Sequence, residues 1–265
     1  MTSTTNGRGI QSIEIGGRLL AALASAAKPM MLRDLAEAAA IPPGQAHAYL
    51  VSYRKLELVE QDPVSGRYRL GPFALHLGLA RLRGVEPYQL ASEAIATLVD
   101  QLDLAATIAV WGTHGATVVR VQESSHQIHA NVRPGSVFGL TTTATGRLFA
   151  AFLPQRLVEP MIKAELRDPS RQSQTGLPRP TLAELRAELA GIRRRGLAST
   201  QGQPIPGLSA LSGPVFDHSG QMQVAITLIG PSAVVDVSAE SAQAAALLAF
   251  TNGLSERLGY RRPAA

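Results

Sequence analysis

Three short apolar-periodic segments follow one another in the first quarter of the chain, and they restrict its fold more than any other feature. Residues 12–26 carry leucines at helical spacing and stop before a proline, since the residue preceding proline avoids helical dihedrals. Residues 32–41 repeat the pattern until Pro-Pro-Gly interrupts it, and a third segment begins at Pro43 and continues to about Leu56. The pattern predicts three short helices joined by tight turns.

The third segment separates apolar from polar residues. Ala46, Leu50 and Tyr53 recur at helical spacing and predict a stripe that faces inward. The opposite face carries short or polar side chains, namely Gly44, Gln45, His47, Ala48, Ser52 and Lys55. Two helices joined by a tight turn, the second with a polar tip, are typical of a helix-turn-helix.

Two alternating segments, LELVEQD and RYRL, follow directly and are linked by the turn sequence PVSG. They predict a two-stranded hairpin with Arg67 and Arg69 among its exposed positions. Three helices followed by a basic hairpin form a winged helix-turn-helix, whose third helix enters the major groove of DNA while the hairpin touches sugar and phosphate. Some winged helices contact protein instead, and the pattern leaves that alternative open.

Positive charge is concentrated in the same region. The chain of 265 residues has a formal net charge of +5. Residues 1–83 hold 10 Lys and Arg against 6 Asp and Glu, whereas residues 84–265 hold 15 against 14. A local positive excess attracts polyanions, and a near-neutral remainder suits small-molecule binding or oligomerisation. Solvated surfaces alone also produce such a small excess, so charge supports the DNA interpretation without deciding it.

Composition excludes several kinds of site. The chain has no cysteine, hence no disulfide and no thiolate ligand, and its six histidines form no cluster with metal-ligand spacing. We therefore expect no metal and no other cofactor. An apolar run of 18 residues is absent, as is an apolar segment at the N-terminal end, which predicts a cytoplasmic protein without a membrane segment. The length predicts two domains.

Residues 72–83, PFALHLGLARLR, predict a helix between the two domains. Its large apolar residues are distributed around several sides of the helix and are Phe73, Leu75, Leu77, Leu79 and Leu82. Because an isolated linker would leave this apolar surface in water, we expect the helix to pack on its own domain or to pair with its copy in a second chain.

The remainder of the chain alternates strand and helix patterns. ATIAVWG and ATVVRVQ surround GTHG and predict a hairpin whose turn exposes His114. Further strands are expected in IHANV, LSGPVF and MQVAITLI, and helices over residues 88–102, 143–152, 181–195 and 239–258. Strand runs interleaved with helices favour the α+β class, with a mostly antiparallel sheet covered by helices.

These segments resemble the IclR family of bacterial transcriptional regulators. The likeness extends from QSIEIGGRLLAALAS to the hairpin and continues, in the family's order and spacing, through LTTTATGRLFAAFLP, IRRRGLAS, PGLSALSGPVFDHSG and VAITLIGP. The resemblance implies a DNA-binding domain over residues 1–71, a dimerisation helix over 72–86 and a GAF-like effector-binding domain over 87–265. It also implies a double-stranded DNA operator and a small organic acid effector as partners. A homodimer is expected, with two dimers pairing into a homotetramer.

The predicted DNA-contacting residues depart from the family pattern at the start of the third helix. Gly44 and Gln45 replace a common serine or threonine pair, and Ala48 replaces a basic residue. Gln45 suits adenine, His47 suits guanine or phosphate, and Ala48 suits a thymine methyl, although His47 has the alternative of a surface histidine without a partner. The predicted interface comprises Arg33, Pro43, Gly44, Gln45, His47, Ala48, Ser52, Arg54, Lys55, Arg67 and Arg69.

The resemblance also implies an effector pocket, carried over position by position. It is lined by Ala144, Thr145, Thr200, Ala210, Thr227 and Ile229, with Trp111, Leu140 and Leu208 as further apolar walls. Thr200 replaces a common acidic residue, Ala210 a cysteine and Ile229 a serine. Because the pocket has lost polar groups, it favours a larger acid, such as an aromatic carboxylate, over a two- or three-carbon oxoacid. Core positions that bind no ligand are the alternative.

We therefore expect a ligand-responsive repressor or activator of a catabolic or metabolic operon, and not an enzyme. The motifs G-x-S-x-G, G-x-x-x-x-G-K-[ST] and H-E-x-x-H are absent, and no catalytic residues are predicted. The alternative is a small-molecule-binding enzyme or sensor whose winged helix contacts protein rather than DNA.

Overall fold

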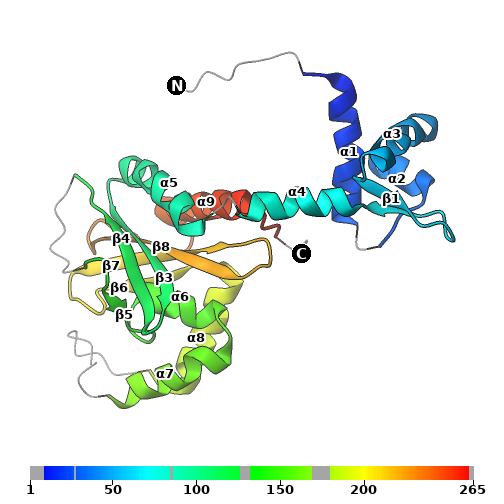
Figure 1. Ribbon diagram of the computed structural model, residues 1–265. Helices are drawn as coiled ribbons and strands as arrows, with labels where there is room; N and C mark the ends of the chain where they lie inside the picture. Colours follow the sequence, from blue (N-terminus) through cyan, green and yellow to red (C-terminus); the bar gives the residue numbers. More distant parts are fainter. Residues whose placement is uncertain (1–8, 27, 84–85, 126–131, 169–179, 263–265) are drawn as a thin grey trace. The chain divides into compact units, whose positions relative to one another are not determined.

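A computed structural model describes residues 9–26, 28–83, 86–125, 132–168 and 180–262. The chain divides into two compact units, Met1–Gly84 and Val85–Ala265, which are described separately (Figure 1). The strand expected at IHANV, residues 128–132, and the loop expected at residues 173–180 lie almost wholly outside the described residues.

The N-terminal unit contains the three predicted helices. They are α1 (Gln11–Ser25), α2 (Leu32–Ala38) and α3 (Pro43–Lys55). Leu19, Leu35 and Leu50 are fully buried and hold the three helices around one small core. Ile13 of α1 is apolar but points to solvent, and it is 68% exposed. The three-helix arrangement is therefore confirmed, with a narrower apolar face on α1 than its composition suggests.

Backbone conformation at Ala40 and the two prolines fixes the turn between α2 and α3. Ala40 adopts a left-handed φ of 53°, and the Ile41 amide donates to the Ala36 carbonyl at 3.0 Å, which closes the end of α2. Pro42 is extended, and Pro43 occupies the first turn of α3, where a missing N–H costs nothing. The tight turn sets the entry of α3.

The predicted hairpin forms the wing of this unit. Strand β1 (Val59–Gln61) pairs antiparallel with β2 (Tyr68–Leu70), and Met30 adds an isolated bridge to Tyr68. Tyr68 is buried against the helices, so the base of the wing is anchored in the core. Helix α4 (Pro72–Arg83) follows, over the residues that the sequence predicts.

The C-terminal unit is built on a six-stranded sheet of order β5-β4-β3-β8-β7-β6, in which every neighbouring pair is antiparallel. The strands are β3 (Ala105–Gly112), β4 (Gly115–Gln122), β5 (Val137–Phe138), β6 (Ala198–Gln201), β7 (Leu208–Phe216) and β8 (Met222–Pro231). The predicted hairpin is confirmed as β3 and β4, with an exposed His114 in its turn. Strands β5 and β6 were not predicted, because two and four residues show too little alternation.

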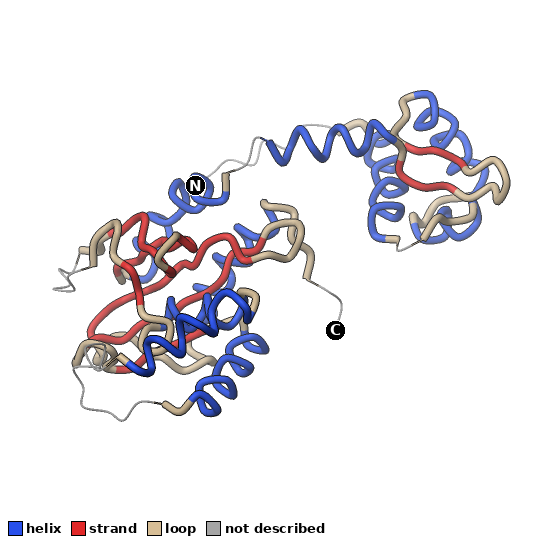
Figure 2. The backbone as a smooth tube through the Cα atoms, turned by 60° about the horizontal axis from the view of Figure 1, so that its bottom comes forward, coloured by secondary structure: helices blue, strands red, loops and turns tan. Residues whose placement is uncertain are grey.

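Helices cover both faces of this sheet (Figures 1 and 2). One core lies under α5 and α9, and a second lies under α6, α7 and α8. The helices are α5 (Pro87–Leu102), α6 (Ala144–Phe152), α7 (Gln155–Arg167), α8 (Leu182–Arg195) and α9 (Ala242–Arg257). The α+β class and the antiparallel sheet are confirmed. Helix α7 was missed because Pro160 lies inside it, a position that normally ends a helix.

Candidate nucleic-acid interface and effector site

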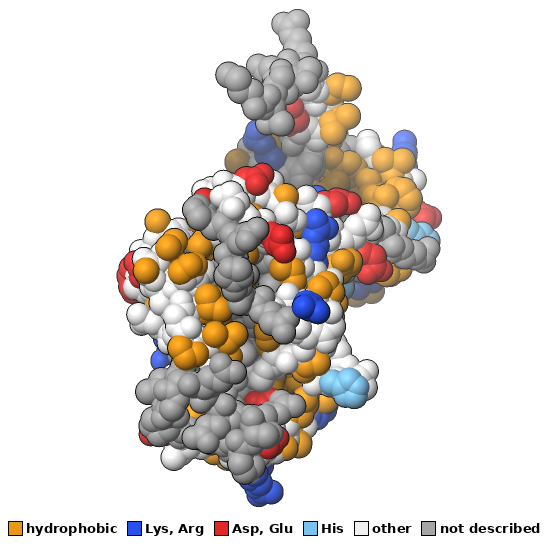
Figure 3. Space-filling view, turned by 90° about the vertical axis from the view of Figure 1, so that its left-hand side faces the viewer, with side chains coloured by type: hydrophobic (Ala, Val, Ile, Leu, Met, Phe, Trp, Pro, Cys, Tyr) orange, Lys and Arg blue, Asp and Glu red, His pale blue; other side chains and the backbone are white. Residues whose placement is uncertain are grey.

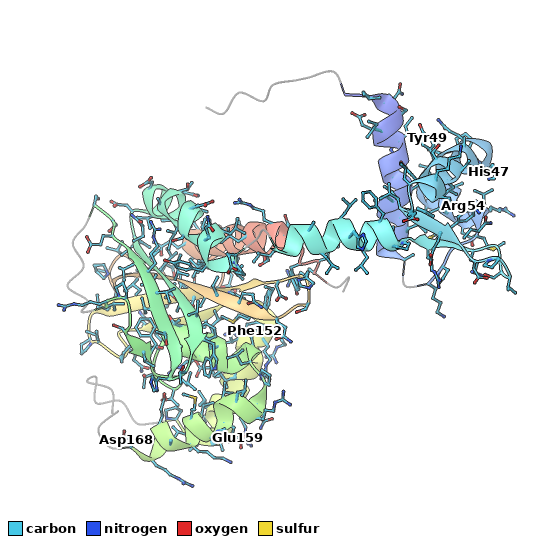
Figure 4. All side chains as sticks on the ribbon, viewed as in Figure 1. His47, Tyr49, Arg54, Phe152, Glu159 and Asp168 are labelled. Carbon is cyan, nitrogen blue, oxygen red and sulfur yellow. The ribbon has the colours of Figure 1, made fainter. Side chains whose placement is uncertain are left out.

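Helix α3 exposes the face that the sequence assigns to DNA. Gln45, His47 and Ala48 are exposed near its N-terminal end, and Ser52 follows on the same side. The buried residues of the helix are Ala46 and Leu50. The polar side chains on this face therefore contribute little to the core. Figure 4 shows His47 on this helix. The face is free to contact a partner.

Two tyrosines hold the opposite side of α3 against α1. The rings of Tyr49 and Tyr53 lie 6.3 Å apart, and both approach Gly16 of α1 so closely that an added Cβ would lie 2.0 Å from the Tyr53 hydroxyl. Burial is the main cause that raises the pKa of Tyr53 above its ordinary value. The tyrosines thus belong to the packing that orients α3.

Arginines link α3 and the wing to nearby groups. Arg54 Nη1 donates to Gln61 Oε1 at 3.1 Å, Arg67 Nη1 donates to the Pro29 carbonyl at 3.2 Å, and Arg69 Nε lies 2.5 Å from Glu60 Oε1. Since a guanidinium carries five N–H donors, each arginine keeps donors that point to solvent. Arg33 and Lys55, the other two predicted phosphate contacts, are exposed. All five cations are accessible.

The wing turn is closed by Asp62. Its Oδ1 accepts from Val64 N at 3.1 Å, Ser65 N at 2.6 Å and Ser65 Oγ at 2.8 Å. The hydrogen bond from the Ser65 backbone N–H is the main cause that lowers the pKa of Asp62 below its ordinary value. Asp62 is the last residue of the segment LELVEQD, but its role in closing the turn was not predicted.

Helix α4 leaves its large apolar side chains uncovered. Phe73, Leu75, Leu77 and Leu79 are 41%, 63%, 51% and 40% exposed. Four such residues on twelve positions form an apolar surface that a soluble chain ordinarily covers with a partner.

The predicted effector residues occupy one face of the sheet in two adjacent rows. Strand register pairs Thr200 with Ala210 and Ala210 with Ile229, so the three side chains form the first row. The second row contains Thr227, paired with Ser212 on one side and with Thr107 on the other. Paired residues of an antiparallel sheet share a face. The register therefore brings Thr200, Ala210, Thr227 and Ile229 together under α6.

A chain of buried hydroxyls ties α6 to this face. Thr145 Oγ1 and Thr227 Oγ1 lie 2.8 Å apart, and Ser212 Oγ lies 2.8 Å from Thr227 Oγ1. All three side chains are at most 1% exposed. Ser212 was missed from the sequence, although its place two residues after Ala210 in a strand puts both on one face.

Two further hydroxyls of the same face are unpaired. Within the described residues, Thr200 Oγ1 and Thr107 Oγ1 are buried and have no hydrogen-bond partner. A buried hydroxyl without a partner costs about 1–3 kcal/mol, so it requires an explanation. A polar ligand lying on this face would supply the missing partner.

The turn before α6 is held by its own side chains. Thr143 caps the helix by accepting from Gly146 N at 2.9 Å, and neither Ala144 N nor Thr145 N has an acceptor within the described part of the chain. Such first-turn amides favour an anion. Gly146 lets the turn approach, since a Cβ there would lie 2.0 Å from the Gly139 carbonyl oxygen.

Two charged side chains, Glu165 and Arg147, form hydrogen bonds with the backbone of this turn. Glu165 of α7 accepts from Leu140 N at 3.0 Å, Thr141 N at 3.1 Å and Thr141 Oγ1 at 3.2 Å. Arg147 donates from Nε and Nη2 to the Thr141 carbonyl and from Nη1 to Glu188, at 3.0, 2.9 and 2.9 Å. Glu165 was missed with α7, but its spacing of seven and three residues from Val158 and Ile162 indicates a buried face.

The three predicted apolar walls differ in their surroundings. Leu140 is 1% exposed and lies at the α6 turn. Trp111 lies on the α6 side of the sheet, with its ring centroid 5.7 Å from that of Phe149. Leu208 is half-buried at the end of β7, one row beyond Ala210. The sheet register thus puts Leu208 one row from Ala210 and Trp111 two rows from Thr107, while Leu140 lies outside the strands.

Other kinds of site receive no support from the described residues. No group of three or more His, Cys, Asp or Glu side chains there is placed to hold a metal ion. None of the described helices is both long and apolar enough to cross a membrane. On the face drawn in Figure 3, acidic, basic and apolar side chains are interspersed and form no large patch of a single kind.

Comparison with known proteins covers both units. Residues 12–63 match the IclR helix-turn-helix domain, and residues 81–256 match the domain described as bacterial transcriptional regulator IclR C-terminal. The chain is 35% identical to Pseudomonas aeruginosa HmgR, with a TM-score of 0.84 over 95% of this chain and 99% of that one. Agobacterium tumefaciens repressor BlcR has the same fold, with 22% identity and a TM-score of 0.76 over 97% and 100% of the two chains. The glycerol operon regulatory protein of Streptomyces griseus is 28% identical over 84% of this chain and 86% of its own length.

Proposed function

Because the chain belongs to the IclR family of bacterial transcriptional regulators, we propose that it controls an operon by binding its operator through α3 and the wing, in response to an organic acid. The observation that carries the proposal is the exposed polar face of α3, which contributes little to the core and belongs to a helix that Tyr49 and Tyr53 pack against α1. A rigid helix with a free polar face suits entry into a major groove.

Base recognition is assigned to the exposed tip of α3. Gln45 would pair with adenine, His47 with guanine or phosphate, and Ala48 with a thymine methyl, while Pro43, Gly44 and Ser52 border the groove. The exposed cations Arg33, Arg54, Lys55, Arg67 and Arg69 would hold the phosphates. Arg54 and Arg67 are already held by protein partners, which lowers the cost of ordering them on DNA.

We assign dimerisation to α4. Its exposed Phe73, Leu75, Leu77 and Leu79 offer an apolar surface that a second copy would cover, with pairing of two dimers as the further step. Two recognition helices related by a two-fold axis match a palindromic operator. Members of this family regulate transcription and are generally not enzymes, and we place this chain in the cytoplasm with its DNA.

The effector is assigned to the hydroxyl-lined face under α6. The free amides of Ala144 and Thr145 would hold a carboxylate, and Thr200 would gain the partner that its buried hydroxyl lacks. Ala210 and Ile229 make the rest of the first row apolar, which favours an aromatic acid. An acid that binds more tightly to one arrangement of the DNA-binding units than to another changes the operator affinity. The change is limited by the difference between its two binding free energies.

A gel shift with the DNA that flanks the protein's own gene tests the proposal. If about four cations per chain contact phosphate, a dimer neutralises about eight charges, and log K should fall with log[salt] at a slope on the order of −7. A competitor duplex of scrambled sequence is the control. Failure to bind any duplex at low salt would favour the alternative, a sensor or enzyme whose winged helix contacts protein.

A thermal-shift screen of aliphatic and aromatic acids tests the effector. A ligand that binds only the folded protein increases the free energy of unfolding, by about 2.7 kcal/mol at a ligand concentration a hundred times Kd. The melting temperature rises as a result. An aromatic acid that raises the temperature and changes the gel shift would support the proposal. No shift with any acid would contradict it.

A further inference from the structure

A groove lies between α7 and α8, away from the hydroxyl-lined face. Its volume is about 220 Å³, and its walls are the apolar side chains of Val158 and Ile162 from α7 and of Leu185 and Leu189 from α8. These four residues are buried in the second core, so the groove has a rigid apolar floor rather than mobile surface chains.

The acidic residue of the rim is already neutralised. Figure 4 labels Glu159 on α7. Its Oε1 lies 2.7 Å from Lys163 Nζ and 3.0 Å from Arg186 Nη2. Hydrogen bonding from Lys163, then from Gln155 and Arg186, lowers the pKa of Glu159 to about 2. A ligand entering the groove therefore does not meet an unpaired negative charge.

The two basic residues of the rim differ, because Arg186 is paired with Glu159 whereas Arg193 has donors that are not used. Arg193 Nε donates to the Ala151 carbonyl at the end of α6, which holds the guanidinium at the mouth of the groove. Within the described part of the chain, its two Nη groups have no acceptor. Paired N–H donors of a guanidinium match the two oxygens of a carboxylate. The groove thus combines a fixed cation with an apolar floor.

We propose that this groove binds a monocarboxylate with an unbranched apolar tail of medium length, at a site separate from the face under α6. The carboxylate lies on the Nη groups of Arg193, and the tail lies between Ile162 and Leu189. A volume of about 220 Å³ is below the range of roughly 300–1,000 Å³ of drug-sized ligands, and it suits a chain of medium length. Charge and shape together select an amphipathic acid over a sugar, a nucleotide or a cation.

Isothermal titration of the full chain with octanoate tests the proposal. We expect saturable binding of octanoate, binding by octanol at least tenfold weaker because it lacks the charge, and binding by hexanoate roughly tenfold weaker because it lacks two methylenes. If octanoate does not bind, or if octanol binds equally well, the proposal is wrong.

Three consecutive arginines provide a matched control. Arg193→Gln should weaken octanoate binding about tenfold or more, whereas Arg194→Gln, which removes the same charge beside the groove without lining it, should leave the affinity unchanged. Equal losses in the two variants would indicate a general effect of charge and would overturn the site.

A second variant guards against misfolding of Arg193→Gln, which also loses the bond to Ala151. Leu182→Asp places a negative charge on the groove wall at the first position of α8, where an acidic residue is favourable for the helix. It should abolish octanoate binding in a chain that remains folded by far-ultraviolet circular dichroism, with some loss of melting temperature because Leu182 packs against the second core. Unchanged binding in Leu182→Asp would place octanoate elsewhere and contradict the proposal. If wild type fails to bind and Leu182→Asp alters the oligomeric state, a second copy covers the groove instead.

Discussion

The two proposed sites differ in where they keep their polar groups. On α3, Gln45 and His47 lie in solvent, and the helix is held by other residues. Under α6, Thr145 and Thr227 are each 1% exposed and are part of the packing that they line. The proposed DNA-binding face thus lies outside the core of its unit, whereas the proposed effector face is part of the core. Substitutions should separate recognition from stability in the first region and couple them in the second.

The largest effect is expected at the α6 turn. Gly146→Ala forces a Cβ against the Gly139 carbonyl at 2.0 Å, and because the obstacle is backbone the turn itself must move. We expect the C-terminal unit to lose about 3 kcal/mol of unfolding free energy. Trp111 is the one tryptophan of the chain and lies in this unit, so denaturant unfolding followed by its fluorescence measures the loss.

A glycine in an open place is the control for this variant. Nothing lies within 4 Å of a Cβ built on Gly253 in α9, so Gly253→Ala should gain up to about 1 kcal/mol from helix propensity. A loss in both variants, or in neither, would show that contact with the Gly139 backbone does not set the cost.

The second effect concerns recognition alone. Gln45→Ala and His47→Ala should each reduce the preference for operator over scrambled duplex by about 10- to 100-fold, since a base contact contributes about 1–3 kcal/mol. The melting temperature should hardly change, because both side chains are exposed. Gel shifts and thermal unfolding measured on the same preparations check this. A parallel fall of both quantities would mean that α3 is not independent of the core.

A smaller effect tests the buried region with two threonines of one face. Thr227→Val removes a hydroxyl bonded to Thr145 and Ser212, and should cost about 1–2 kcal/mol. Thr200→Val removes an unpaired hydroxyl and should stabilise the protein by about 1 kcal/mol while weakening effector binding. Trp111 fluorescence and the thermal-shift assay measure the two consequences. If Thr200→Val destabilises the chain, its hydroxyl has a protein partner and is not a ligand group.

The contrast between the regions also explains what could be predicted from the sequence. Helix α3 and the wing are defined by neighbouring residues, because prolines, turn residues and a short apolar stripe act locally. Helix α4 was predicted to its end residues for the same reason. The order and spacing of motifs then identified the family and placed Thr200, Ala210 and Ile229, which the strand register brings into one row.

The parts that could not be predicted depend on distant partners. Helix α7 contains Pro160, which normally ends a helix and obscures the helical spacing of Val158, Ile162 and Glu165. Glu165 is buried because amides 24 and 25 residues away need an acceptor, and Ser212 matters because Thr227 lies opposite. Such roles follow from pairings that only the folded chain creates.

The smallest expected effect tests whether burial, rather than location in the C-terminal unit, makes a polar group important for stability. Glu159 lies in the C-terminal unit, but its partners Lys163 and Arg186 are about half exposed. In this respect the group resembles the exposed polar face of α3. Its pKa is lowered to about 2, so its contribution to stability is present above the ordinary value of 4.5 and is lost as the pH falls through about 2. NMR titration of the Glu159 side-chain carboxyl should show a midpoint near 2, and Lys163→Gln, which removes the main cause, should raise it. Because solvent screens such pairs, Lys163→Gln should leave the unfolding free energy at pH 7 nearly unchanged. If Lys163→Gln instead lost as much unfolding free energy as Thr227→Val, exposed polar groups of the C-terminal unit would stabilise it as much as buried ones do.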